Sequence, residues 1–252
     1  MKNFLITMTL AIVLFCSTSF SVYQLDLCRE INLIEIDTLS VAGDTYHVKW
    51  LLKEDFESGK WRENWVLETT KADVEIKEGK LFMTDYGIGS TLWYKKELPQ
   101  HIIVKYTTQS ERGMTDTKLN FNHFSHAREN DGTDLKIGKE SGRTGAYVQY
   151  HQFTNYIATL TYKHSRIRKD PGFQLLSDSQ VYSEENQVYN VVYTVQKGRV
   201  RYYLNDVKVH DVRDAQPLRG GKFGLRTWNT HASWENIEIG LVIGSQSSLT
   251  LE

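Results

Sequence analysis

Short strand-like segments follow one another along most of this chain, and tight turns separate them. Each segment is rich in Val, Ile, Thr, Tyr, Phe and Trp and is bounded by Gly, Asn or Asp, a pattern typical of strands. Sustained helical periodicity does not occur between them. The segments span residues 102–106, 119–124, 146–151, 156–163, 189–196, 199–204, 207–210, 223–228 and 234–241. This succession predicts an all-β domain, a two-sheet antiparallel sandwich of the jelly-roll type.

The composition excludes two classes of protein. Lys and Arg number 30 against 31 Asp and Glu, which gives a net charge of −1 and excludes a broadly basic nucleic-acid-binding protein. Hydrophobic residues make up 40% of the chain, too many for a disordered one. Aromatic residues reach 12%, which favours strands and faces that stack on sugar rings.

The first residues have the pattern of a secretory signal peptide. Lys2 precedes an apolar run over 4–15, and Ser19-Phe20-Ser21 has the small-x-small pattern of a cleavage site. The run is shorter than the roughly 20 residues that span a bilayer. We therefore predict cleavage before Val22, a periplasmic or secreted protein, and no membrane insertion after cleavage.

We expect a single domain after the predicted signal peptide, residues 1–21. Residues 22–53 form an N-terminal extension predicted to add strands, 54–244 form the jelly roll, and 245–252 form a flexible tail. Loss of the signal peptide leaves Cys28 as the remaining cysteine, so no intramolecular disulfide is predicted. The core alone then supplies the stability, and we expect a monomer.

Two long connections predict the rim of a cleft. Residues 127–144 are charged and glycine-containing, and residues 169–187 are polar and contain Pro171-Gly172. Long loops in compact domains are usually functional or disordered. Both loops flank the same central strands, so we expect the site between them.

Several motifs resemble those of concanavalin-like jelly rolls. The carrying segments are 55–59 with Trp61 and Trp65 near the start, and 202–206, 221–226 and 234–237 near the end. More narrowly, the chain resembles the YesU-like family of small bacterial jelly rolls, which occur among genes for breaking down acidic, rhamnose-containing polysaccharides. The resemblance covers about 54–239, and 143–151 is its most specific part.

The resemblance implies an enzyme that acts on uronic-acid oligosaccharides by β-elimination, such as dehydration of ulvan oligosaccharides. This chemistry needs a cation to neutralise the carboxylate, a base for the C5 proton and an acid for the group leaving C4. His and Tyr suit the proton transfers, and the planar fork of Arg suits the carboxylate. We therefore expect a carbon–oxygen lyase, either a dehydratase or an exo-lyase, with an acidic oligosaccharide as partner.

Strand alternation selects the candidate residues. In 119–124 it places Asn120 and Asn122 on one face and His123 on the other, and in 146–151 it places Tyr147 and His151 on one face. The predicted catalytic residues are His123, His151, Tyr147 and Tyr162. The predicted substrate-binding residues are Arg226, Lys163, Arg143, Asn120, Asn122, Tyr150 and Trp228. We expect a concave sheet face to carry the site, with His123 and His151 in one cleft. The basic run Arg166, Arg168 and Lys169 is a further candidate for contact with carboxylate or sulfate groups.

Other interpretations stay open. His123 fits a hydrogen-bonded core histidine, and Tyr150 and Tyr162 fit packing residues. The same fold serves non-catalytic carbohydrate-binding modules, lectins and glycoside hydrolases. No cofactor motif or zinc spacing is present, so no cofactor is predicted, although Asp131 and Asp134 leave room for a structural calcium ion.

Overall fold

The computed structural model describes residues 35–113 and 119–247. The predicted signal peptide, Cys28 and the end of the predicted tail lie outside the described residues. The chain divides into two units, 1–37 and 38–252, and the described strands belong to the second unit apart from the first residue of β1.

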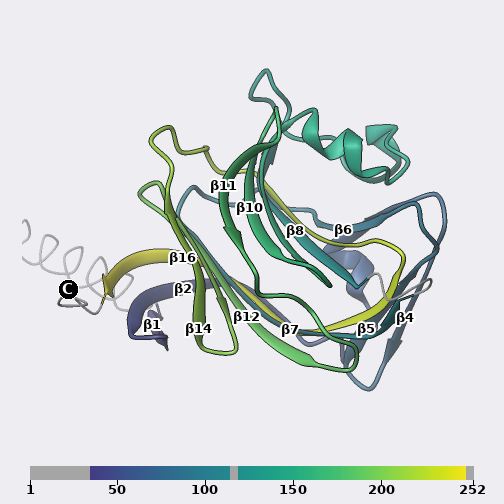
Figure 1. Ribbon diagram of the computed structural model, residues 1–252, viewed down its shortest axis with the longest axis horizontal. Coiled ribbons are helices and arrows are strands. Elements are labelled where there is room, and N and C mark those ends of the chain that lie inside the picture. Colours follow the sequence, from purple (N-terminus) through teal and green to yellow (C-terminus); the bar gives the residue numbers. More distant parts are fainter. Residues whose placement is uncertain (1–34, 114–118, 248–252) are drawn as a thin grey trace, which may run out of the picture. The chain divides into compact units, whose positions relative to one another are not determined.

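The described strands form two antiparallel sheets that face each other, which makes the fold a two-sheet jelly-roll sandwich (Figure 1). The nine-stranded sheet contains β1 (Asp37–Val41), β2 (Asp44–Glu54), β4 (Ala72–Lys77), β5 (Lys80–Asp85), β7 (Ile102–Gly113), β12 (Val188–Gln196), β13 (Arg199–Leu204), β14 (Val207–Arg213) and β16 (Thr230–Ser247). The seven-stranded sheet has the order β11 (Gln174–Ser179), β10 (Ser165–Asp170), β9 (Thr154–Thr161), β8 (Asn120–Arg128), β15 (Lys222–Thr227), β6 (Ser90–Tyr94) and β3 (Trp65–Glu68).

The main hydrophobic core lies between the two sheets. Trp65, Tyr193 and Trp234 are among its largest buried side chains, and all three are at most 1% exposed. Alternation along β5 shows the reason for the two layers: every second residue is buried and the others are partly exposed. The inward residues of both sheets therefore meet in one apolar layer, as the alternating sequence pattern predicts.

A second apolar cluster covers part of the outer face of the seven-stranded sheet. Trp93 on β6, Phe124 on β8 and Ile157 on β9 point outward, and Tyr150 and Phe153 pack on them. The covering segment follows β8 and contains the 3-10 helices η2 (Gly138–Ser141) and η3 (Tyr147–His151); a third, η1 (Trp61–Glu63), precedes β3. Figure 1 shows η2 and η3 beyond the seven-stranded sheet, on the side away from the nine-stranded sheet.

The prediction of a strand over 146–151 is wrong, because these residues form η3. Val148 would face the protein core if these residues formed a strand, but it is 62% exposed. A 3-10 helix has three residues per turn, so Tyr147 and Tyr150 lie on the same side. Both rings consequently lie close to the guanidinium of Arg226, at 5.2 and 5.3 Å from its Cζ.

The register of the seven-stranded sheet aligns polar residues across four strands. Arg166 on β10 pairs with Thr159 on β9, which pairs with Asn122 on β8. Asn122 in turn pairs with Arg226 on β15. These residues lie beside the apolar row that contains Phe124, so the outer face changes from apolar to polar between successive rows.

Candidate functional site

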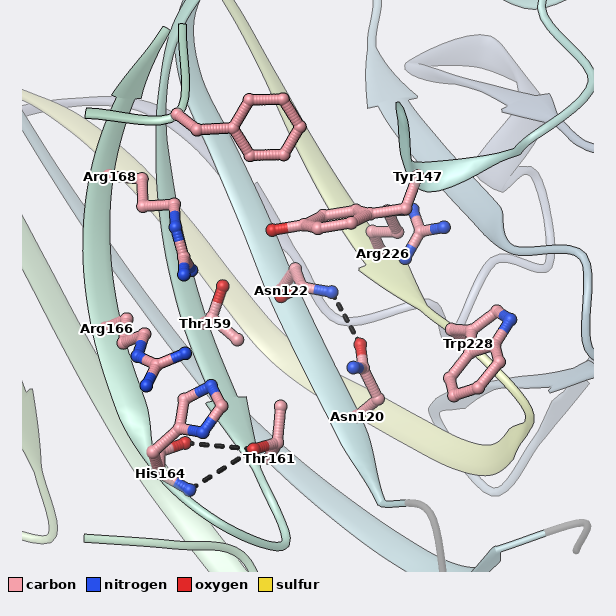
Figure 2. A pocket seen from close by; sticks show the side chains of 11 residues that line it. Asn120, Asn122, Tyr147, Thr159, Thr161, His164, Arg166, Arg168, Arg226 and Trp228 are labelled. Carbon is pink, nitrogen blue, oxygen red and sulfur yellow. Dashed lines mark hydrogen bonds between the residues drawn. The ribbon is translucent and has the colours of Figure 1, made fainter. Parts of the chain in front are cut away.

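A pocket of about 400 Å³ lies on the outer face of the seven-stranded sheet (Figure 2). Its floor is the polar part of β8, β9, β10 and β15, and η3 and the turns after β9 and β10 supply the remaining walls. The lining residues are Asn120, Asn122, Tyr147, Thr159, Thr161, His164, Arg166, Arg168, Phe173, Arg226 and Trp228. None of these lining residues is acidic, so the pocket is suited to an anion.

Buried polar atoms on the floor have no protein partner. Asn122 donates from Nδ2 to Oδ1 of Asn120 at 2.5 Å, but its own Oδ1 has no hydrogen-bond partner among the described residues. The same holds for Oγ1 of Thr159 and Nε of Arg226 within the described part of the chain. Buried polar atoms are normally hydrogen-bonded, so these three atoms are available to water or to a polar ligand.

Arg226 is the most buried cation of the pocket, with 1% exposure. Its Nη2 donates to the carbonyl oxygen of Gly145 at 2.9 Å, and no carboxylate of the described residues forms an ion pair with it. Burial lowers the pKa of this guanidinium, and the neighbouring tyrosines and Asp85 oppose that shift. An arginine remains charged under these conditions, so Arg226 offers a desolvated positive charge to a ligand.

Close backbone packing fixes Arg226 in place. A Cβ on Gly89 would lie 2.1 Å from Nη2 of Arg226, and a Cβ on Gly145 would lie 2.0 Å from the carbonyl oxygen of Gly89. Both glycines also have positive φ angles, 111° and 102°. Only glycine allows both this close approach and a positive φ angle without strain.

Tyr147 forms the wall above Arg226. Its ring lies over the guanidinium, and its hydroxyl points across the pocket toward β10 (Figure 2). Burial raises the pKa of this phenol, while Arg168 and Arg226 act in the opposite direction. The hydroxyl is therefore protonated at neutral pH and available as a proton donor.

The opposite side of the pocket carries two further arginines and a histidine. The side chain of Arg168 makes no ion pair or hydrogen bond within the described residues, whereas that of Arg166 pairs with Asp178 at 2.9 Å. Burial lowers the pKa of His164, and the charges of Arg166 and Arg168 lower it further. His164 is therefore neutral at pH 7 and has a free lone pair.

An indole lies at one end of the pocket. Trp228 follows β15 directly, and its Nε1 donates to the carbonyl oxygen of Gly87 at 2.8 Å. This bond fixes the ring plane at the rim (Figure 2). Fixed aromatic rings of this kind stack on the apolar faces of sugars.

A buried histidine–aspartate pair adjoins the pocket. His151 is 4% exposed, and its Nδ1 lies 2.9 Å from Oδ2 of Asp170. Phe173 stacks on the imidazole with ring centroids 3.4 Å apart, and Tyr147 meets it edge-on at 4.4 Å. His151 thus touches two lining residues without lining the pocket itself.

One buried carboxylate holds the η2–η3 segment on the sheet. Glu68, on β3, accepts hydrogen bonds from Nε of Arg143 at 2.9 Å and from the hydroxyl of Tyr150 at 2.8 Å. It also accepts from the backbone N of Gly138 at 3.1 Å. Arg143 and Tyr150 were predicted to bind substrate, but the structure places both in this anchor and not in the pocket lining.

His123 was predicted to share a cleft with His151, and this prediction is wrong. His123 points into the core between the sheets, where Nδ1 lies 2.9 Å from the hydroxyl of Tyr106 and the ring packs on Tyr193 at 4.4 Å. Burial lowers its pKa to about 3. Alternation itself implies this result, because Asn122 faces the pocket and its neighbour must face the opposite way.

Two more of the predicted site residues, Lys163 and Tyr162, do not line the pocket. β9 ends at Thr161, so Lys163 is in an exposed turn, with its Nζ 4.9 Å from the ring centroid of Tyr162. Among the predicted residues, the pocket does contain Tyr147, Asn120, Asn122, Arg226 and Trp228.

Sequence reasoning assigned no role to His164, Thr159, Thr161 or Phe173. For His164 the signal was its place two residues before the basic run. The run itself, with Arg166 and Arg168 two residues apart, does supply two lining residues. Phe173 lies in the connection 169–187, which was expected to form the rim of the cleft, although no role was assigned to this residue.

No group of three or more His, Cys, Asp or Glu side chains that could hold a metal occurs within residues 35–113 and 119–247. Asp131 binds the backbone N and hydroxyl of Thr133, and Asp134 pairs with Arg128 at 3.2 Å. In the described residues no helix is long and apolar enough to cross a membrane.

The fold and this pocket define a galectin-like or concanavalin-like jelly roll with a cation-lined site on one sheet. A protein of unknown function with a galectin-like fold from Bacillus subtilis shares this fold at 18% identity and a TM-score of 0.67, covering 82% of this chain and 98% of that one. The carbohydrate-binding module CBM66 from Bacillus subtilis has 13% identity and a TM-score of 0.52, over 70% and 95% of the two chains. The potassium-bound carbohydrate recognition domain of Emp46p has 14% identity and a TM-score of 0.51, over 77% and 96%.

The chain belongs to the family described as a domain of unknown function, DUF6250, whose model matches residues 84–237. This range includes every residue that lines the pocket. No curated protein matches the sequence.

Proposed function

We propose that this protein binds an acidic oligosaccharide in the pocket and carries out β-elimination at its uronic acid. The observation that carries the proposal is the charge of the lining: three arginines, no carboxylate, and a buried Arg226 without an ion-pair partner among the described residues. Export, as the signal-peptide pattern predicts, belongs to the same proposal.

The lining of the pocket suits both the carboxylate and the hydroxyl-bearing ring of a uronate-containing sugar. Arg226 and Arg168 offer charge-assisted hydrogen bonds to a carboxylate, and such bonds are stronger than those between neutral groups. Asn120 and Asn122 present amides that bind hydroxyl groups, and Trp228 presents an aromatic face. The fold likeness to a carbohydrate-binding module and a carbohydrate recognition domain supports a sugar as ligand.

The directions of the pKa shifts assign His164 as the base and Tyr147 as the acid. In the proposed step the imidazole of His164 accepts the C5 proton, and the electron pair of that bond forms the C4–C5 double bond. The bond from C4 to its oxygen breaks, and this oxygen takes the proton of Tyr147. The burial-lowered pKa of His164 and the burial-raised pKa of Tyr147 match these roles. A departing hydroxyl leaves as water, which makes a dehydratase, and a departing sugar makes a lyase.

A second candidate is a non-catalytic binding module, which the fold likeness favours as well. Glycoside hydrolysis receives less support, because it ordinarily uses two carboxylates at the scissile bond. None of the residues that line this pocket is Asp or Glu.

The test incubates the protein with uronate oligosaccharides and follows ultraviolet absorbance and product mass. A new absorbing product supports elimination, with loss of water from an intact oligomer or chain scission identifying the leaving group. Binding without product would favour the module. Arg168→Ala should weaken binding of acidic oligosaccharides, whereas the control Lys163→Ala should not. Equal binding of acidic and neutral oligosaccharides of one length would contradict the proposal.

A further inference from the structure

We propose that Phe173 is a displaceable cap over the His151–Asp170 pair, and that His151 accepts a hydrogen bond from a ligand hydroxyl once the cap moves. The cap itself is independent of the proposed function, whereas the hydrogen bond rests on it.

The tautomer of His151 follows from its partner. The Asp170 carboxylate is 1% exposed and accepts hydrogen bonds only, so Nδ1 of His151 carries the proton. In the neutral imidazole Nε2 then carries the lone pair. This buried atom has no hydrogen-bond partner among the described residues, although polar atoms at such sites are normally satisfied.

The group that covers His151 is itself exposed. Phe173 is 52% exposed, yet its ring stacks on the imidazole at 3.4 Å and also lines the pocket. Large apolar side chains lose little when they rotate from one partly exposed position to another. Movement of this one ring therefore uncovers one face of the His151 imidazole without disturbing the main core.

The backbone at Phe173 forms a tight turn that Asp170 holds in place. Phe173 has φ at 62°, an uncommon value for a bulky residue, and the preceding Gly172 has φ at 107°. Oδ1 of Asp170 accepts a hydrogen bond from the backbone N of Phe173 at 2.8 Å. Asp170 thus orients the imidazole with one oxygen and holds the turn with the other, so the backbone can stay fixed while the side chain moves.

The first experiment needs no ligand. Diethyl pyrocarbonate acylates unprotonated imidazoles, and peptide mass spectrometry gives the rate at each histidine. In the wild type, His151 should react far more slowly than the half-buried His47. In Phe173→Ala it should react up to about tenfold faster, which is the equilibrium shift expected from loss of one stacked ring.

Leu175→Ala is the matched control, because Leu175 is 50% exposed on the adjacent β11. It should leave the rate at His151 unchanged. Reaction of His151 at the rate of His47 in the wild type would overturn the cap, and so would equal rates in the wild type and Phe173→Ala.

The second experiment tests the hydrogen bond with a uronate oligosaccharide. In Phe173→Ala, bound oligosaccharide should protect His151 from the reagent, and His151→Gln should weaken binding about tenfold. Protection is read in a variant that keeps the buried pair, so it does not depend on the folding of His151→Gln. Binding without protection would overturn the role of His151 and leave the proposed function intact. No binding by the wild type would refute the proposed function and the hydrogen bond, while the reactivity result for the cap would stand.

Discussion

Arg226 has the features of a ligand-binding cation at the scale of a single residue. Its charge is desolvated, and its Nε has no hydrogen-bond partner in the described part of the chain. We expect Arg226→Lys to keep the charge but lose the planar fork, which should weaken binding of a uronate oligosaccharide about tenfold to a hundredfold. Calorimetry of binding measures the effect. Unchanged affinity in a folded variant would place the carboxylate elsewhere, with Arg168 the next candidate.

Tyr147 allows a sharper test, since its ring and its hydroxyl have separate roles. Tyr147→Phe keeps the ring over Arg226 and removes the proton donor. The rate of formation of the unsaturated product should fall by about 10²-fold or more, while binding changes far less. Tyr162→Phe is the control, because Tyr162 lies outside the pocket lining. A rate within a few-fold of wild type for Tyr147→Phe would exclude this hydroxyl as the acid.

At the scale of elements, the Glu68 carboxylate anchors the η2–η3 segment beside the apolar contacts of Tyr150 and Phe153. The side chain of Glu68 is 1% exposed and that of Arg143 10%, and Tyr150 shares the same carboxylate. Breaking a buried pair leaves an uncompensated charge, so Glu68→Ala should lower the free energy of unfolding by about 3 kcal/mol. Chemical denaturation measures this loss, and limited proteolysis should show new cleavage within 129–153.

A surface ion pair provides the comparison for this anchor. Arg166 and Asp178 have side chains that are 29% and 38% exposed. Asp178→Ala should therefore change stability by less than about 1 kcal/mol. Equal losses for Glu68→Ala and Asp178→Ala would show that the segment is held by its apolar contacts instead.

At the scale of the whole molecule, buried histidines make stability depend on pH. Burial lowers the pKa of His123 to about 3 and those of His126 and His210 to about 4. Below about pH 6.5 the unfolded chain binds protons that the folded protein cannot bind. The contribution of these histidines to the free energy of unfolding is therefore fully present above this pH. It is lost as the pH falls toward 4, by up to about 1.4 kcal/mol per pH unit for each histidine.

Thermal denaturation across this pH range measures the loss. His123→Gln removes one titrating group. The free energy of unfolding of this variant should therefore fall less steeply with acid than that of the wild type, and the difference in slope should correspond to about one bound proton. Its stability at pH 7 will be lower as well, because Tyr106 loses its partner. Parallel slopes for the two proteins would show that His123 is not the proton-linked group.

The layer structure of this protein could be predicted from local sequence patterns. Alternating burial is a local property of a strand, so the all-β class and the outward direction of Asn120, Asn122 and Arg226 could be predicted from neighbours along the chain. The basic run that contains Arg166 and Arg168 was visible for the same reason. Local pattern failed at 146–151, where three-residue and two-residue periods both fit a six-residue stretch.

Tertiary structure decided which of these residues meet. Strand order and register bring Arg166, Asn122 and Arg226 into one row, although these residues are far apart in the sequence. Arg143 pairs with Glu68, 75 positions away, and this long-range contact turns a candidate ligand-binding residue into an anchor. The physical reason is that a charged side chain has the same local signal whether a protein carboxylate or a ligand satisfies it. Only the packing of distant strands shows which of the two is present.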